Sequence, residues 1–188
     1  MTAIEEMSAE HRVIARVIHS LPEAVAALDQ GRRLNVATLR GVAEFLRVYA
    51  DQRHHQREEG IFFPLLVQRG VPPEGCPIGG LNNEHGKGRV LVAALVEAIT
   101  GHEQQRAGAD AALRQVLQDL VTLYQKHLWM EDAMVFPMAE KLVTAADHEA
   151  LNKQFADLDR TIGADVVARW EQFAASLSFQ AEGPIAAL

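Results

Sequence analysis

Mostly apolar side chains recur along this sequence at alternating intervals of three and four residues, which is the spacing of one face of an α-helix. The clearest run begins at Leu113 and ends at Met138. Similar spacing extends over three further segments, whereas the alternation at every second residue that is typical of strands is absent. We therefore predict helices at residues 3–29, 35–69, 81–104 and 109–143. Narrow seams of this kind pack in bundles, so the expected fold is an all-α, up-down antiparallel four-helix bundle.

A shorter amphipathic segment follows these four and extends from Phe155 to Leu177. We predict that residues 1–160 form the bundle, and that residues 161–188 form an additional short C-terminal helix and a tail. Trp170 and Phe173 would pack this helix either on the bundle or on a partner chain. The second arrangement would make the protein a homodimer.

The chain also repeats itself once. Glu10-His11 recurs 74 residues later as Glu84-His85, and the pattern His54-x-x-x-Glu58 recurs 73 residues later as His127-x-x-x-Glu131. Phe-Pro follows the glutamate in both copies. The repeated unit is a helical hairpin, so we expect two hairpins related by a pseudo-twofold axis.

Histidine and glutamate occupy seam positions that should face the core. Burying such groups costs several kcal/mol unless they are paired or bind a metal. Four imidazoles and two carboxylates without a thiolate suit iron or manganese better than structural zinc. If two irons share both carboxylates and an oxo or hydroxo bridge, each retains about one open position. The alternative is a buried hydrogen-bond network without metal. The six candidate ligands are His11, His54, Glu58, His85, His127 and Glu131.

His55 and Glu59 form a competing pair, rotated about 100° around the same helix. The repeat aligns His55 with Leu128, so we expect His55 to lie at the surface or behind the ligands rather than to bind metal. Glu59 aligns with Asp132, and we expect both to face solvent or to pair with Arg57 and its neighbours. On this view alanine at position 58 should lower the iron content, whereas alanine at position 59 should not.

Three further residues are candidates for supporting roles. Asp51 and Tyr124 lie three residues before His54 and His127. Asp51 would orient a ligand imidazole or lie on the helix surface, and Tyr124 would donate a hydrogen bond to bound oxygen or fill the core. Arg89 would reach the entrance of the site or pair with an acid such as Glu84, with a surface position favoured.

In combination, these motifs resemble the hemerythrin-like, or HHE cation-binding, family of non-haem di-iron proteins over residues 4–160. The resemblance implies that the six candidates hold two irons, bridged by Glu58 and Glu131. Oxygen-carrying hemerythrins have a second histidine where this chain has Arg89, so the resemblance favours chemistry over reversible oxygen carriage. The motifs are Glu10-His11-Arg12, Asp51-x-x-His54-His55-x-x-Glu58-Glu59, Phe63-Pro64, Glu84-His85, His127-x-x-x-Glu131-Asp132 and Phe136-Pro137-Met138-Ala139-Glu140.

The expected function is binding of O₂, NO or peroxide at an open iron position, with reduction of that ligand by an external electron donor. The alternative is a non-catalytic binding or sensing module. Manganese or zinc in place of iron, iron-centre repair and iron storage are less favoured.

Composition narrows the partners and the compartment. A net charge of −7 argues against nucleic acid, since phosphate binding needs clustered Lys and Arg. No apolar run approaches the ~20 residues of a membrane span. With Cys76 as the single cysteine and no signal-peptide pattern at the start of the sequence, we expect a cytoplasmic protein.

Overall fold

The computed structural model describes residues 1–179, and these contain helices and no strands. The predicted tail at residues 180–188 lies outside the described residues. Helix α1 (Ala3–Asp29) begins at Thr2, whose side-chain oxygen accepts a hydrogen bond from the backbone N–H of Glu5 while the Glu5 carboxylate accepts one from the backbone N–H of Thr2. This reciprocal capping satisfies N–H groups that the first helical turn leaves without partners.

The second helical stretch changes its winding along its length. It consists of α2 (Val36–Phe45), the π-helical segments η1 (Leu46–His55) and η2 (Glu58–Phe62), and α3 (Phe63–Gln68). The third stretch is α4 (Ile78–Glu103), and the fourth is α5 (Ala109–Met130), the π-helical segment η3 (Glu131–Val135) and α6 (Phe136–Ala139). The second and fourth stretches thus contain π-helical turns around the two repeated His-x-x-x-Glu patterns.

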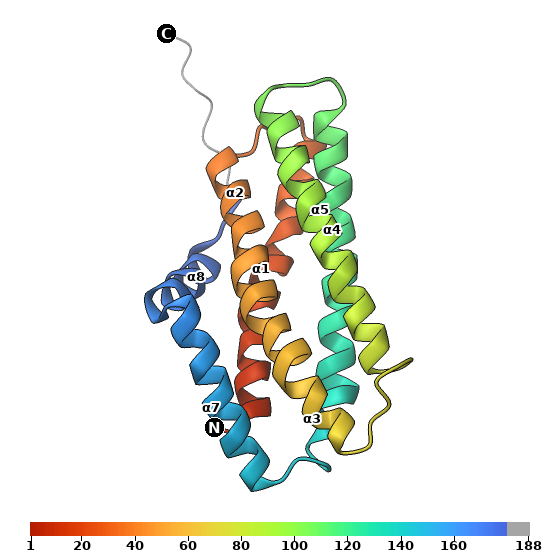
Figure 1. Cartoon of the computed structure of the whole chain (residues 1–188). Coiled ribbons are helices and arrows are strands. Elements are labelled where there is room, and N and C mark those ends of the chain that lie inside the picture. Colours follow the sequence, from red (N-terminus) through yellow and green to blue (C-terminus); the bar gives the residue numbers. More distant parts are fainter. Residues whose placement is uncertain (180–188) are drawn as a thin grey trace.

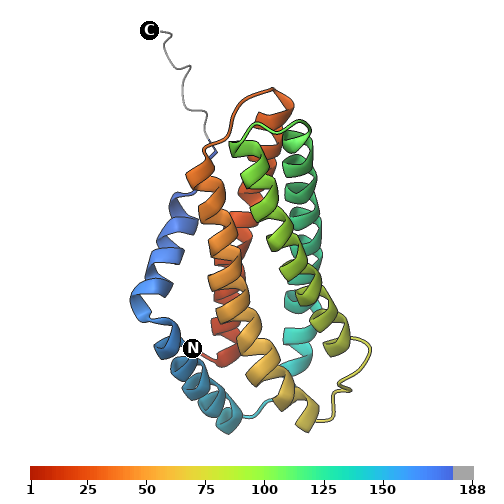
Figure 2. The ribbon, with the colours of Figure 1, turned by 45° about the horizontal axis from the view of Figure 1, so that its top comes forward.

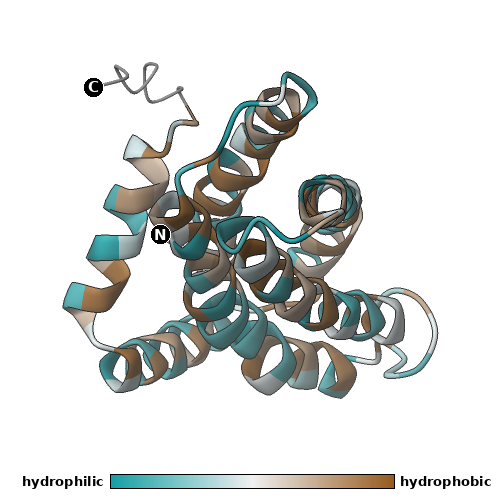
Figure 3. Ribbon diagram, turned by 90° about the horizontal axis from the view of Figure 1, so that it is seen from above, coloured by the Kyte–Doolittle hydropathy of each residue, from teal (hydrophilic) through white to brown (hydrophobic). Residues whose placement is uncertain are grey.

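The four stretches lie side by side and successive stretches run in opposite directions (Figures 1 and 2). Contacts between α4 and α5 and between α1 and α5 are the most extensive. Hydrophilic and hydrophobic residues alternate around the helices (Figure 3). The arrangement is all-helical, as predicted, and it is consistent with the expected up-down bundle.

The apolar core has two parts. One cluster includes Ile14, Leu21, Phe45 and Leu117, and the other includes Met7, Phe62, Phe136 and Phe155. Along α1, His11 lies between Met7 of one cluster and Ile14 of the other. Apart from His102 near the end of α4, the buried polar side chains therefore form a layer between two apolar clusters, which shield it from solvent at both ends.

Two helices follow the four stretches, where the sequence predicted one from residue 161. Helix α7 (Ala145–Ile162) begins earlier than expected, and α8 (Ala164–Ser176) follows it after Gly163. Gly163 has a φ of 101°, which a residue with a side chain rarely adopts. Both helices contact α1 (Figure 2). Phe155 of α7 is fully buried in one cluster, and Trp170 of α8 packs in the other.

Among the described residues, no helix is long and apolar enough to cross a membrane.

Candidate metal centre

Each of the four seam histidines is held from behind by a carboxylate. The contacts from histidine Nδ1 are His11 to Asp132 at 2.9 Å, His54 to Glu10 at 2.8 Å, His85 to Glu59 at 2.7 Å and His127 to Glu84 at 3.2 Å. A carboxylate at Nδ1 fixes the orientation of an imidazole ring and leaves its Nε2 free to bind a metal. All four rings are oriented in this way.

The four Nε2 atoms meet the two seam glutamates in the interior. Glu58 reaches both halves of the repeat, with its two oxygens 3.6 Å from His54 Nε2 and 3.3 Å from His85 Nε2. Glu131 does the same, since its Oε2 lies 3.3 Å from the Nε2 atoms of His11 and His127. Each carboxylate is therefore shared between the two halves.

These contacts define two groups whose ligand atoms all lie within 4.8 Å of one another. The first comprises His11, His54, Glu58 and Glu131, and the second comprises Glu58, His85, His127 and Glu131. We call them the first and the second position. In the first, His11 Nε2 and His54 Nε2 are 2.9 Å apart, a spacing that two ligands of one metal at about 2.1 Å would have.

The oxygen and nitrogen atoms that would bind a metal are buried, and most of them have no hydrogen-bond partner in the described part of the protein. All six side chains are at most 2% exposed. Both oxygens of Glu58 and of Glu131, and the Nε2 atoms of His85 and His127, lack a hydrogen-bond partner among the described residues. Buried polar atoms in proteins are nearly always partnered, and each exception needs an explanation. A pair of cations between the two carboxylates would provide one.

Without metal, protons balance part of the buried negative charge. Burial lowers the pKa of His11, but the neighbouring carboxylates of Asp132 and Glu131 outweigh burial and raise that pKa to about 10. Burial also lowers the pKa of His85, but the neighbouring carboxylates of Glu58 and Glu59 outweigh burial and raise that pKa to about 9. Two imidazolium ions then face two carboxylates. A metal that enters this site has to displace those protons.

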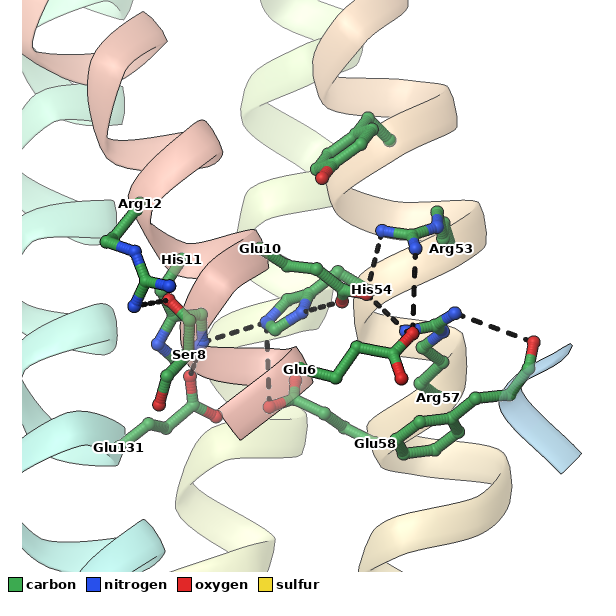
Figure 4. Close-up of polar contacts among 12 residues, drawn as sticks. Glu6, Ser8, Glu10, His11, Arg12, Arg53, His54, Arg57, Glu58 and Glu131 are labelled. Atoms are coloured by element: carbon green, nitrogen blue, oxygen red, sulfur yellow. Dashed lines mark hydrogen bonds and ion pairs between the residues drawn. The ribbon is translucent and has the colours of Figure 1, made fainter. Parts of the chain in front are cut away.

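Behind the first position lies a network of charged side chains that the sequence did not predict (Figure 4). Glu10, which holds His54, also forms an ion pair with Arg53 at 2.7 Å and accepts a hydrogen bond from Arg57. Arg53 and Arg57 in turn contact Asp159 of α7, at 2.9 and 2.8 Å. Arg57 is fully buried and its guanidinium lies 4.6 Å from the ring centre of Phe155. Helix α7 is thereby linked to the imidazole of His54 through two successive sets of ion pairs, from Asp159 to the two arginines and from the arginines to Glu10.

The structure corrects the placement of Glu59 and Asp132. We expected both to face solvent or to pair with Arg57, but they hold His85 and His11. Although Asp132 is 48% exposed, its carboxylate turns inward. Alanine at position 59 would therefore disturb the site, so it cannot serve as the neutral control that the sequence suggested.

The three candidates for supporting roles lie on the side of the second position. Asp51 contacts His55 rather than one of the six predicted ligands, at 3.4 Å. Arg89 pairs with Asp51 and Glu59 and does not pair with Glu84. Tyr124 is buried, and its ring centre lies 6.4 Å from that of His127.

His55 is buried, with 3% of it exposed, so of the two expected placements the surface one is wrong and the interior one is retained. Its burial lowers its pKa well below the ordinary value, so the ring is neutral at pH 7. The expectation of a surface position assumed α-helical winding, which separates neighbouring residues by about 100°. Segment η1 ends at His55 and has the wider turns of a π-helix, which are frequent at functional sites. Both His54 and His55 can therefore face the interior.

Comparisons with known proteins agree with this geometry. The chain is 26% identical over 157 residues to uncharacterised proteins of Mycobacterium bovis and Mycobacterium tuberculosis. The match covers 84% of this chain but only 61% of those relatives, so the chain spans about three-fifths of their length. No solved structure matches the chain. The family model of the hemerythrin HHE cation-binding domain matches residues 2–139, and the chain therefore belongs to that family.

Proposed function

We propose that the protein is a non-haem di-iron protein that binds O₂, NO or peroxide at an open iron position and reduces it. The observation that supports this most strongly is the convergence of four carboxylate-anchored imidazoles on two shared glutamates, among which both glutamates and two of the imidazoles have buried atoms without a hydrogen-bond partner. The nitrogen and oxygen donors without thiolate favour iron or manganese over structural zinc. Two positions with both carboxylates in common favour two metals over one.

The shape of the surrounding protein supports a small ligand. A pocket of about 230 Å³ borders His11 of the first position and is lined by Ala15 and Leu128 among others. A second pocket of similar volume reaches the side of the second position beside His55 and Tyr124. Apolar clusters enclose the remaining sides. Two irons would supply the electrons for the chemistry, while the chain orients the imidazoles and limits access by water.

The second candidate is a module that binds or senses the same ligands without turnover. Steady-state consumption of peroxide or NO, in the presence of an electron donor and well above that of free iron, would establish the enzyme. Stoichiometric binding without turnover would leave the binding module.

Metal analysis of the purified protein tests the site itself. We expect about two irons per chain after expression with ample iron, and near-ultraviolet charge-transfer bands in air. Glu58→Ala and Glu131→Ala should each lose most of the iron, because each removes a carboxylate that both positions share. Glu97→Ala is the matched control, since Glu97 is 74% exposed and pairs only with Arg106 among the contacts described. Wild-type protein with no metal, or with one zinc, would refute the proposal.

A further inference from the structure

One pocket beside the metal centre is larger than a diatomic ligand or peroxide needs. It lies between η1 and α4, which contact each other, and its volume is about 230 Å³. The small ligands are little larger than a water molecule, which takes up about 30 Å³ of the liquid, whereas an apolar protein cavity of about 150 Å³ holds benzene. The pocket therefore has room for a single six-membered ring with a small substituent.

Apolar side chains form much of the pocket wall. They are Leu46 of η1 and Val92, Ala93 and Val96 of α4. Leu46 is fully buried whereas Val96 is 47% exposed, so the mouth of the pocket lies at Val96. A water molecule is held well only by about two to four polar partners, which an apolar wall does not supply. An apolar ligand gains affinity when it displaces such loosely held water.

The charged residues that line the pocket are already paired. Arg89 contacts Asp51 at 2.8 Å and Glu59 at 2.7 Å, and Arg47 contacts Glu44 at 2.6 Å. Each guanidinium thus has a carboxylate partner, and no lining residue offers an unpaired charge to an ionic ligand. Burying an ion without a partner is costly. These pairs therefore favour a neutral ligand.

One polar group on the pocket floor is uncharged and has no partner. Tyr124 is 3% exposed, and its hydroxyl forms no hydrogen bond with another described residue. The hydroxyl oxygen lies 3.8 Å from the place that a Cβ on Gly88 would occupy, and both residues line the pocket. Buried polar groups are nearly always hydrogen-bonded. A hydroxyl or carbonyl group on a ligand would provide the missing partner.

We propose that this pocket binds a small neutral organic molecule, with an apolar body of about one ring and a hydroxyl or carbonyl group that Tyr124 holds. The His55 ring separates the molecule from the second position, since its centre is 6.1 Å from that of Tyr124 and 3.9 Å from that of His85. The inference adds an organic ligand to the O₂, NO or peroxide of the proposed function. It does not depend on iron, because none of the six predicted metal ligands lines the pocket.

Isothermal titration calorimetry of the iron-loaded chain with benzyl alcohol tests the pocket. We expect one molecule bound per chain. In Gly88→Val the new Cβ would be in ordinary contact with Leu123 and Tyr124, at 3.7 and 3.8 Å, and its methyl groups would fill part of the pocket. This variant should bind benzyl alcohol at least about 10-fold more weakly. Gly86→Val is the matched control on the same helix, because nothing lies within 4 Å of its Cβ, and it should bind like wild type.

Two comparisons test the chemistry of the ligand. Tyr124→Phe removes only the hydroxyl, so benzyl alcohol should bind about 3–10-fold more weakly. Toluene, which has no hydroxyl, should bind to this variant as it binds to wild type. Benzylammonium has the shape of benzyl alcohol and a positive charge, so it should bind to wild-type protein at least about 10-fold more weakly than benzyl alcohol.

Three results would overturn the inference. Wild-type protein that binds no benzyl alcohol, or that binds benzylammonium as tightly, would do so without requiring any variant to fold. A folded Gly88→Val protein with wild-type affinity would place the ligand elsewhere. Equal effects of Tyr124→Phe on benzyl alcohol and toluene would show that the hydroxyl does not hold the ligand. A chain that takes up no iron but binds benzyl alcohol would refute the proposed function and leave this inference standing.

Discussion

The contact between α7 and the bundle gives a sharp test of how the centre is supported. Asp159 accepts hydrogen bonds from Arg53 Nε and Nη2, at 2.9 and 3.0 Å, and forms an ion pair with Arg57 Nη2 at 2.8 Å. Asp159→Asn keeps the shape of the side chain and one acceptor oxygen but removes its negative charge. Glu10 would then be the nearest remaining carboxylate for two buried guanidinium groups.

The size of the effect follows from burial. Removing one partner of a fully buried ion pair typically costs about 3–5 kcal/mol. The side chain of Asp159 is 26% exposed, so water can replace part of the lost interaction. Asparagine also retains hydrogen bonds of roughly half the strength. We therefore expect a loss of about 2–3 kcal/mol in the free energy of unfolding, or a decrease of about 5–10 °C in Tm for a chain of this size.

Urea unfolding of metal-free wild-type and Asp159→Asn protein, followed by circular dichroism, measures this loss. Asp157→Asn is the control, since Asp157 is half-exposed and pairs only with exposed Arg160 among the contacts described, so its loss should stay below about 0.5 kcal/mol. Asp159 holds the two arginines that contact Glu10, and Glu10 orients His54. Asp159→Asn should therefore also bind iron about 10-fold more weakly. An Asp159→Asn protein as stable as the control variant would refute the view that α7 fastens the centre.

Two further predictions concern protons and packing. The pKa of His11 is about 10 and that of His85 about 9 in the metal-free protein. Both are raised, so their protons stabilise the metal-free fold below about pH 6.5, and this contribution is lost as the pH rises through 9 to 10. Calorimetry at pH 7.5 in buffers of different ionisation enthalpy should accordingly show about two protons released when the site fills, and a proton count near zero would contradict these pKa values. Gly41→Ala would place a Cβ 2.6 Å from the Phe173 ring, so it should destabilise the fold by about 1–3 kcal/mol in thermal unfolding. Gly86→Ala, with open space at its Cβ, should stabilise the fold by about 0.5–1 kcal/mol, and equal effects of the two substitutions would show that α8 does not pack as described.

The sequence was most informative where its pattern was repeated. Helical spacing predicted the four stretches to within four residues, and the largest differences are the third stretch, which begins at Ile78, and the fourth, which ends at Ala139. The repeat singled out six polar seam residues, and the structure brings all six together. Two copies of one pattern make a shared site easier to recognise, because a chance histidine would not recur at the corresponding position.

Sequence reasoning failed where winding or distant partners decide the orientation of a side chain. A surface position for His55, one of the two placements expected, assumed an α-helical turn, and η1 is π-helical there. The partners of Glu59 and Asp132 lie on other helices, 26 and 121 residues away along the chain. Contacts between residues so far apart in the chain leave no periodic pattern in the sequence. Arg57 belongs to the same class, because its partners lie on α1 and α7.

The halves of the repeat are alike in their ligands and unlike in what supports them. The repeat aligns Glu10 with Glu84 and Arg53 with Lys126. Glu10 is buried under α7, where desolvation raises its pKa despite the nearby guanidinium groups. By contrast, the hydrogen bond from His127 lowers the pKa of Glu84 to about 2, and its second partner, Lys126, has a side chain that is 64% exposed. A repeated sequence predicts a symmetric site, but α7 has no counterpart in the first half of the chain. Its presence on one side fixes Arg53 and Arg57 against Glu10, whereas Glu84 in the second half has only the exposed Lys126 as its cationic partner among the contacts described.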